Sequence, residues 1–374
     1  MLKIKEVETS KEISDFFKFP SKLHQNDPNF VPQLYSEENS IFSLKNNDCF
    51  SFCDVTRFLI YDNNKVVGRF AFIINNRYNS LNNKKELRFT RFDMIDDKSV
   101  FDIFFDKAKE FAISHNLDTI VGPFGFSSMD YNGLLLDNFD TMGTCFSSCC
   151  YEYVSKYFLE NGFNVDKELY VLYLDISNYD DPRYEKMCKY ILDNYGLVIK
   201  KPNNDSELVE MIANGIKLTN EINEIYQKDL YFAPYTDKQI NSLSLFISEL
   251  TNYNYTVSIY KDEKLVGFCY ASPSLAKALK KSKGRIGPAT SIRLHNAFKQ
   301  NDTVDFPFIA ISREFKDINI ESVLFFELLK EFKKNGVNKI YTNPIECDKY
   351  PINIINGYSF NKYKKIGILK YNIE

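Results

Sequence analysis

The chain carries the same short patterns twice, in the same order. The three matching pairs are 199, 221 and 195 residues apart: "YDNNKVVGRF" (61–70) with "YKDEKLVGFC" (260–269), "FFDKAKEF" (104–111) with "FFELLKEF" (325–332), and "NGF" (161–163) with "NGY" (356–358). An internal repeat of this size, in a chain of 374 residues, predicts two similar folding units.

Each pair predicts one kind of secondary structure. The first reads as two strands joined by a tight polar turn, with Gly68 or Gly267 in the second strand. The second has apolar residues at the three-and-four spacing of a helix, and leads to a short strand that ends in Pro123 or Pro344. The third precedes a strand of alternating apolar residues. A hairpin followed by strand, helix and strand predicts an α/β fold with a mixed sheet.

We therefore predict tandem units at residues 1–178 and 196–374, with a linker helix at 179–195 after a polar joint. The offset grows from 199 to 221, so the second unit carries 22 extra residues after its hairpin. It then falls to 195, so the first unit carries 26 extra residues after the strand that ends in Pro123.

Composition excludes several classes of protein. The net charge of -3 argues against a bulk nucleic-acid binder, and no apolar run approaches the ~20 residues of a membrane helix. Three distant histidines (His24, His115, His295) and scattered cysteines predict neither a metal site nor a hydrolase triad. We expect free thiols, a cytoplasmic location and no membrane partner.

Five segments carry a resemblance to a known superfamily. They are "NDPNFVPQLYSEE" (26–38), the hairpin at 65–76, "GPFGFSSMDYNGLLLDNFD" (122–140), "LVGFCYASPSLAKALKKSKGRI" (265–286) and "ISREFKDINIESVLFFELL" (311–329). These segments resemble the GNAT N-acetyltransferases in a tandem arrangement, and more closely an uncharacterised bacterial GNAT-like family. The resemblance implies two GNAT-like domains and acetyl-CoA or another acyl-CoA as the donor.

In that superfamily the fourth strand splays from the fifth beside the pantetheine arm, and the loop and helix after the fourth strand hold the pyrophosphate. The corresponding stretch of the second unit is "FPFIAISREFKDINIESVL" (306–324), in which Asp317 and Asn319 stand at the usual glycine positions. Both residue types tolerate a left-handed backbone. The resemblance assigns these cofactor-binding residues: Ile309, Ile311, Arg313, Lys316, Asp317, Asn319, Ile320, Ser322 and, on the last helix, Asn353.

The equivalent loop of the first unit is "RFDMIDDKSVF" (91–101). Asp93, Asp96 and Asp97 stand where a diphosphate would bind. Acidic residues stabilise a helix N-terminus but repel a polyanion. We therefore expect the first unit to be degenerate and to shape the substrate side of the second.

Three residues are candidates for acid–base chemistry. Tyr350 and Tyr358 flank the last helix, and the superfamily commonly uses a tyrosine there to protonate the leaving thiolate. Glu314 follows the splayed strand and could act as a general base through water. With 25 tyrosines in the chain, packing roles for Tyr350 and Tyr358 stay open, as does a solvated role for Glu314.

Two insertions are candidates for the substrate side. The stretch 121–141 follows the fifth strand, so its glycines do not form a phosphate loop, and Ser127, Ser128 and Asp130 would line a cleft between the units. The segment 274–300 holds seven Lys or Arg residues, including Arg285 and Arg293, and no acidic residue. It would bind a cofactor phosphate, an acidic substrate or RNA, or it is a solvated helical hairpin.

Three functions are consistent with these features. The first is an N-acetyltransferase-like enzyme in which a small-molecule or peptide amine attacks acyl-CoA directly. The second is an aminoacyl-transferase that uses charged tRNA, and the third is a binding or regulatory protein without activity.

Overall fold

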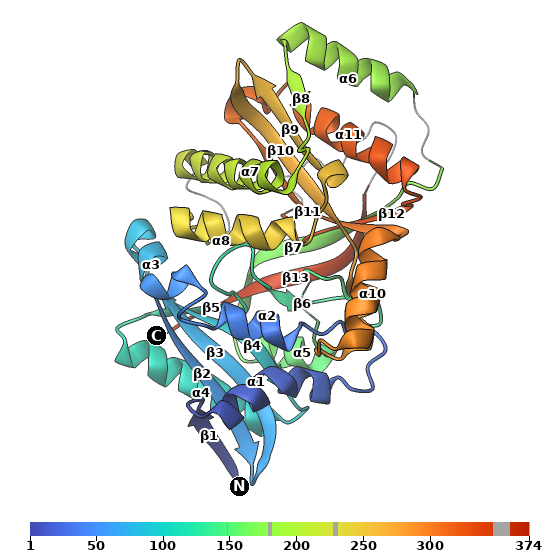
Figure 1. Ribbon diagram of the computed structural model, residues 1–374. Coiled ribbons are helices and arrows are strands. Elements are labelled where there is room, and N and C mark those ends of the chain that lie inside the picture. Colours follow the sequence, from blue (N-terminus) through green and yellow to red (C-terminus); the bar gives the residue numbers. More distant parts are fainter. Residues whose placement is uncertain (148, 179–181, 227–230, 347–359, 374) are drawn as a thin grey trace.

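A computed structural model describes residues 1–147, 149–178, 182–226, 231–346 and 360–373. Their strands form one mixed sheet of 13 strands (Figure 1). From one edge to the other the strands are β1 (Leu2–Glu6), β2 (Cys53–Asp62), β3 (Lys65–Asn75), β4 (Glu86–Met94), β5 (Thr119–Gly122), β13 (Asn361–Asn372), β7 (Asn164–Asp175), β12 (Lys339–Thr342), β11 (Thr303–Ile311), β10 (Lys264–Pro273), β9 (Thr256–Lys261) and β8 (Val198–Lys200), with β6 (Leu134–Leu135) pairing with β13 off this path.

The sheet has the predicted repeat. Read from its two edges, the strand order is β1-β2-β3-β4-β5-β13 and β8-β9-β10-β11-β12-β7, so the two halves match strand for strand. The pairs β4–β5 and β11–β12 are parallel, and the other pairs are antiparallel. The predicted mixed α/β sheet is confirmed.

The two halves exchange their last strands. β7 belongs to the N-terminal half of the chain but pairs with β12, whereas β13, near the C-terminus, pairs with β5. β7 and β13 also pair with each other along most of their length. The boundaries at 178 and 196 remain predictions, and the exchange makes the sheet continuous across them.

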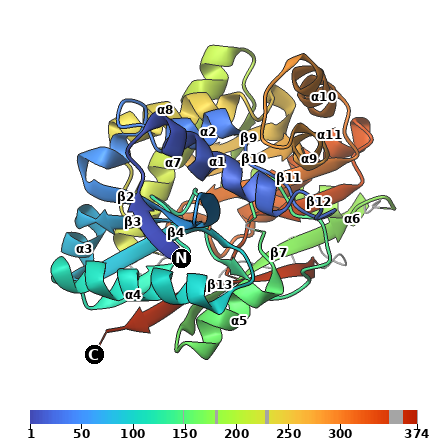
Figure 2. The same ribbon diagram turned by 90° about the horizontal axis from the view of Figure 1, so that it is seen from below.

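Helices cover both faces of the sheet. They are α1 (Ser10–Leu23), α2 (Tyr35–Ile41), α3 (Asn76–Asn82), α4 (Lys98–Ser114), α5 (Glu152–Glu160), α6 (Pro182–Tyr195), α7 (Asp205–Tyr226), α8 (Asp237–Ser248), α9 (Ala276–Ser282), α10 (Pro288–Lys299) and α11 (Ile320–Lys334), with short 3-10 turns at Asp48–Ser51, Tyr253–Tyr255 and Arg313–Phe315. Figure 2 shows α1, α2, α7 and α8 together on one side of the sheet, with α4 and α5 on the other.

The apolar periodicity explains the core. On α4, Val100, Phe101, Phe104, Ala108 and Ala112 recur at helical spacing and are buried against the sheet. β3 is buried at nearly every position, as expected of a strand with helices on both faces.

The repeated glycines have matching roles. A side chain at Gly68 would meet Val100 of α4, and one at Gly267 would meet Ile320 and Leu324 of α11. Both glycines lie beside a shift in strand register, and each allows the helix of its half to lie close to the sheet.

Candidate functional site

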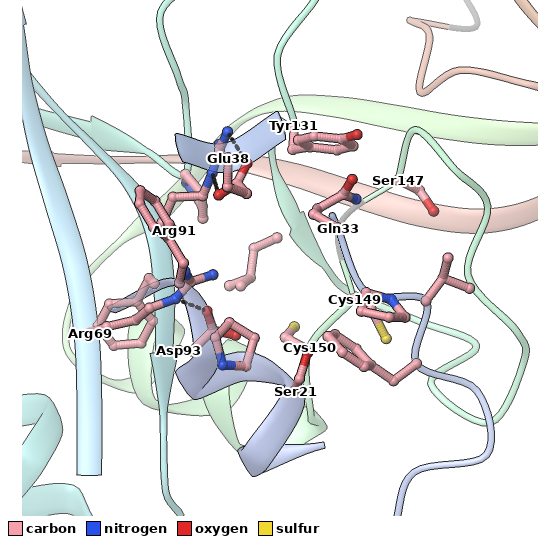
Figure 3. A pocket seen from close by; sticks show the side chains of 18 of the residues that line it. Ser21, Gln33, Glu38, Arg69, Arg91, Asp93, Tyr131, Ser147, Cys149 and Cys150 are labelled. Atoms are coloured by element: carbon pink, nitrogen blue, oxygen red, sulfur yellow. Dashed lines mark hydrogen bonds and ion pairs between the residues drawn. The ribbon is translucent and has the colours of Figure 1, made fainter. Parts of the chain in front are cut away.

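A pocket opens where β4 and β5 separate. It contains about 790 Å³ of empty space, including the part open to solvent. Its lining comes from α1, the segment between α1 and α2, β3, β4 and the 26-residue insertion: Phe17, Pro20, Ser21, Phe30, Val31, Pro32, Gln33, Glu38, Arg69, Arg91, Phe92, Asp93, Pro123, Tyr131, Gly133, Leu134, Ser147, Cys149 and Cys150 (Figure 3).

Local strand geometry creates this opening. β4 pairs with β5 only over Glu86–Arg88, although β4 continues to Met94. The last backbone hydrogen bond between the two chain segments, of 2.7 Å, runs from the Phe124 N–H to the Phe89 carbonyl. A Cβ atom at Gly122 would lie 2.4 Å from that carbonyl oxygen, so only glycine allows this close approach before the strands part.

Arg91 forms an ion cluster in the wall of the pocket. Its guanidinium donates to both carboxylate oxygens of Glu38, at 2.8 and 3.0 Å, and to Asp130 at 2.8 Å. Burial lowers the pKa of Arg91, but Asp130 and Glu38 outweigh burial and raise it. The backbone of Arg91 is left-handed, with φ of 53°, at an irregular step in the β3–β4 register. Beside this step Arg91, Phe92 and Asp93 all line the pocket, whereas side chains of a regular strand would alternate between its two faces.

Asp93 belongs to a second buried ion cluster. It accepts a hydrogen bond of 2.7 Å from Arg69, which also donates to the Phe16 carbonyl at 2.9 Å. His24 lies on the other side of Asp93, with Nε2 3.8 Å from Asp93 Oδ1 and Nδ1 3.5 Å from Asp27. Burial raises the pKa of Asp93, but Arg69 and His24 outweigh burial and lower it.

Two aromatic rings fix the orientation of His24. The imidazole is 3% exposed and stacks between Phe30 and Tyr151, with ring centroids 4.3 and 4.5 Å away. Burial lowers the pKa of His24, but the carboxylates of Asp27 and Asp93 outweigh it and raise the pKa above 6.5.

The opposite wall is neutral. Figure 3 places Gln33, Tyr131 and Ser147 near one another, with Cys149 and Cys150 lower on the same side. Burial raises the pKa of both thiols to about 12. Neither cysteine is therefore a thiolate at neutral pH, and neither is suited to act as a nucleophile. Tyr131 also stays protonated, because burial raises its pKa well above the usual value.

No family model matches the chain. Two curated proteins are similar to it over most of their length. "Protein YghO" of Escherichia coli is 22% identical over 331 residues, which cover 86% of this chain and 82% of that protein. "Bacterial ceramide synthase" of Caulobacter vibrioides is 21% identical over 366 residues, which cover 96% and 94%.

Solved structures give the clearest likeness in fold. A tandem GNAT protein from the clavulanic acid biosynthesis pathway covers 100% of this chain and 98% of its own, with a TM-score of 0.57 and 11% identity. A GCN5-related N-acetyltransferase from Sphaerobacter thermophilus covers 100% and 96%, with a TM-score of 0.52 and 8% identity. The chain has the tandem GNAT fold. At these identities the likeness concerns the fold alone.

In this chain of tandem GNAT fold, the pocket lies where β4 and β5 of the first half separate, whereas the predicted cofactor residues lie on the second half. Ile309 and Ile311 are in β11, and Arg313, Glu314, Lys316 and Asp317 are exposed in the loop after it. Ile320 and Ser322 are buried, and the Ser322 carbonyl accepts a hydrogen bond of 2.9 Å from Tyr184. Glu314 forms an exposed ion pair with Lys264 at 3.6 Å.

Asn319 has the left-handed backbone expected of the turn. Its φ is 63° and its ψ 36°, directly before α11. Tyr350, Asn353 and Tyr358 lie outside the described residues, so their predicted roles remain predictions.

The predicted substrate-side residues separate into three places. Asp130 contacts Arg91 in the pocket wall, and Ser128 Oγ lies 3.2 Å from the Tyr235 hydroxyl of the second half. Ser127, close to Ser128, lines a smaller cavity with Tyr235. Arg285 and Arg293 are exposed on the 22-residue insertion.

The sequence reasoning missed the pocket itself. Glu38, Arg69 and Arg91 were not candidates, and Asp93 was assigned to the helix N-terminus. One signal was available: "RFTRFD" (88–93) places three charges in a strand that should be buried on both faces.

Other site classes have no support within the described ranges. Those residues contain no group of three or more His, Cys, Asp or Glu side chains placed to hold a metal ion. Their helices include none with the length and apolar character of a bilayer-spanning segment.

Proposed function

We propose that the protein is an N-acyltransferase, and that an amine is acylated by an acyl-CoA thioester in the pocket of the first half. The observation that carries this proposal is the pocket's position at the separation of β4 and β5 in a chain of tandem GNAT fold. This is the place where the fold leaves backbone groups without a strand partner.

Asp93 is the proposed anchor for the acceptor amine. Its Oδ2 is bonded to Arg69, while the nearest ion partner of Oδ1 is His24 at 3.8 Å, beyond hydrogen-bond range. Oδ1 can therefore accept a hydrogen bond from a bound amine. Since the pKa of Asp93 is lowered, this carboxylate stays ionised and attracts an ammonium group before reaction.

The other polar residues of the pocket lining lie where the amine and the thioester would react. The bound ammonium first releases one proton to water and becomes the neutral amine. Its nitrogen then forms the new C–N bond as the C–S bond breaks, and the second proton on nitrogen passes to the departing thiolate, which leaves as free CoA thiol. Gln33, Tyr131 and Ser147 offer neutral hydrogen-bonding groups on the wall opposite Asp93.

The acceptor class we propose is a lipid amine. Ceramide, the product named in one relative, is an amide of a fatty acid and a long-chain amino alcohol. The apolar part of the lining, which includes Phe17, Phe30, Val31, Phe92 and Leu134, fits a hydrocarbon chain beside the amine.

The donor's diphosphate is a separate question. At α4, the Asp97 side chain caps the helix N-terminus with a 2.9 Å bond to the Ser99 N–H, and Asp96 lies beside it. At α11, Asn319 makes no side-chain cap, and Arg313 and Lys316 are close in sequence. The second half therefore offers a rival site for a diphosphate, at the placement expected from the sequence, and a donor bound there would react in the second half rather than in the pocket.

The pocket and the loop before α11 lie toward opposite ends of β11, so a reaction at each can be tested separately. α11 follows the end of β11, whereas the start of β11 bonds to Ser274 beside α9, which packs on Val31 of the pocket segment. A single reaction centre therefore cannot depend equally on Asp93 and Lys316.

The test is an assay of acyl transfer from a long-chain acyl-CoA to a panel of long-chain amines. The rate is measured as the release of free CoA thiol. Asp93→Asn is expected to reduce turnover at least about 100-fold, since it removes a group that contacts the amine. Asp106→Asn, which removes an exposed carboxylate of α4, should leave turnover unchanged. Circular dichroism checks that both variants fold.

Lys316→Glu separates the alternatives. If the pocket is the reaction centre, this variant keeps its activity. Loss of activity in Lys316→Glu with full activity in Asp93→Asn would move the reaction to the second half. Absence of any transfer in the wild type would favour a binding role without catalysis.

A further inference from the structure

The 22-residue insertion of the second half forms a basic hairpin on the surface. We call residues 274–300, with helices α9 and α10, the α9–α10 hairpin. It contains no acidic residue and these seven basic ones: Lys277, Lys280, Lys281, Lys283, Arg285, Arg293 and Lys299. Within the described part of the chain only Lys277 forms an ion pair, with Asp302 at 3.3 Å. The positive charge is therefore not neutralised locally.

The outward side of the hairpin also carries two apolar side chains. Ile286 is 57% exposed and Ile292 is 62% exposed. On α10, the positions Thr290, Leu294 and Phe298 turn inward at helical spacing and are buried or half-buried. Ile292 and Arg293 lie on the opposite face with Ala289 and Asn296, so an apolar and a basic side chain point outward together.

The combination of basic and exposed apolar side chains favours one ligand of the hairpin over the others. Exposed apolar side chains occur elsewhere on the described surface, but in the hairpin two of them, Ile286 and Ile292, stand among basic residues with no acidic residue. Nucleic acid is bound by basic residues together with aromatic rings that stack on bases, and Phe298, half-buried on the inward face, is the one Phe, Tyr or Trp of the hairpin. Basic residues interleaved with exposed aliphatic ones instead match the surface of an anionic bilayer.

The hairpin also lies next to the pocket. The Gly284 carbonyl accepts a hydrogen bond of 2.9 Å from the Tyr35 N–H. Ala276 and Leu279 of α9 pack on Val31 and Leu34, and Val31 itself lines the pocket. Figure 1 shows α10 at the edge of the molecule. A membrane bound here would therefore adjoin the segment that forms one wall of the pocket.

We propose that the α9–α10 hairpin docks the protein on an anionic lipid bilayer, with Ile286 and Ile292 inserted at the acyl boundary and the basic residues on the headgroups. The contact is peripheral and reversible. It does not depend on the acyl-transfer reaction, and it supplies a lipid amine with a short path to the pocket.

Vesicle sedimentation tests the proposal directly. The full-length protein is mixed with vesicles of phosphatidylcholine alone, or with one quarter phosphatidylglycerol. Binding is expected only with the anionic vesicles and should weaken in high salt. Arg285→Glu/Arg293→Glu and Ile286→Ser/Ile292→Ser should each reduce the partition coefficient at least about tenfold, because each removes two surface contacts.

Matched controls change the same groups elsewhere. Lys186→Glu/Lys189→Glu alters the net charge equally on α6, and Ile113→Ser removes an isoleucine of similar exposure on α4. Both should bind like the wild type. Equal loss in the controls, no binding to either vesicle, or binding of RNA in preference to vesicles would overturn the proposal. Acyl transfer to a short, water-soluble amine should be unchanged in Ile286→Ser/Ile292→Ser, which distinguishes a docking defect from a catalytic one.

Discussion

At the scale of single residues, the pocket depends on buried charges that compensate one another. Arg91 is 8% exposed and contacts Glu38 and Asp130, while Arg69 contacts Asp93. A buried charge without its partner is strongly destabilising, so these clusters fix the side chains in one arrangement. Asp93 Oδ1, whose ion partner His24 lies 3.8 Å away, is the atom of this arrangement that can accept a hydrogen bond from a ligand.

His24 should make stability depend on pH. Its pKa is raised, so the stabilisation from the protonated ring is complete below the ordinary value of 6.5 and is lost as pH rises through the raised value. His24→Phe keeps the stacking on Phe30 and Tyr151 but cannot be protonated. Urea unfolding at pH 6 and pH 9 should show the wild type's advantage over this variant shrinking at the higher pH. An advantage that grows from pH 6 to pH 9 would contradict the assignment.

The residue scale is also where sequence reasoning was weakest. Glu38 and Arg91 are 53 positions apart and meet only because α2 lies over β4. No local pattern predicts such a contact. The sequence indicated no carboxylate partner for His24. Asp93 lies on a different element, and Asp27, three residues further along the chain, was not identified.

At the scale of elements, the end of β5 is the feature that opens the pocket. Gly122 touches the Phe89 carbonyl, and the chain then leaves β4 through Pro123. The sequence located this strand end, because a short apolar run stops at glycine and proline. It also located both hairpins and both long helices, since these depend on neighbouring residues. Of the two residues that the resemblance placed at glycine positions, Asn319 has a left-handed backbone and Asp317 does not.

Gly122→Ala should destabilise the protein by about 1–3 kcal/mol, because its Cβ atom would lie 2.4 Å from a backbone oxygen that cannot move freely. Gly143→Ala is the matched control, since its Cβ atom would meet nothing closer than 3.6 Å. Its effect should stay within about 0.5 kcal/mol. Chemical denaturation measures both, and equal effects of the two substitutions would show that the close approach at Gly122 is not required.

At the scale of the whole molecule, the exchange of β7 and β13 joins two similar halves into one sheet. The strands that follow "NGF" and "NGY" look alike, so the sequence alone does not tell which half each completes. The repeat predicted two copies correctly but could not predict which copy would hold the larger pocket. The first half has this pocket because α1, α2 and the 26-residue insertion close over β4.

The most direct test of where acylation occurs is amide hydrogen exchange with a thioether analogue of a long-chain acyl-CoA. If the reacting end binds in the first-half pocket, exchange should slow in β4 from Phe89 to Met94 and in residues 131–135. Residues 307–311 of β11 should then exchange at the rate of the free protein. Slowed exchange confined to 307–319, with β4 unchanged, would place the reaction in the second half and contradict the account.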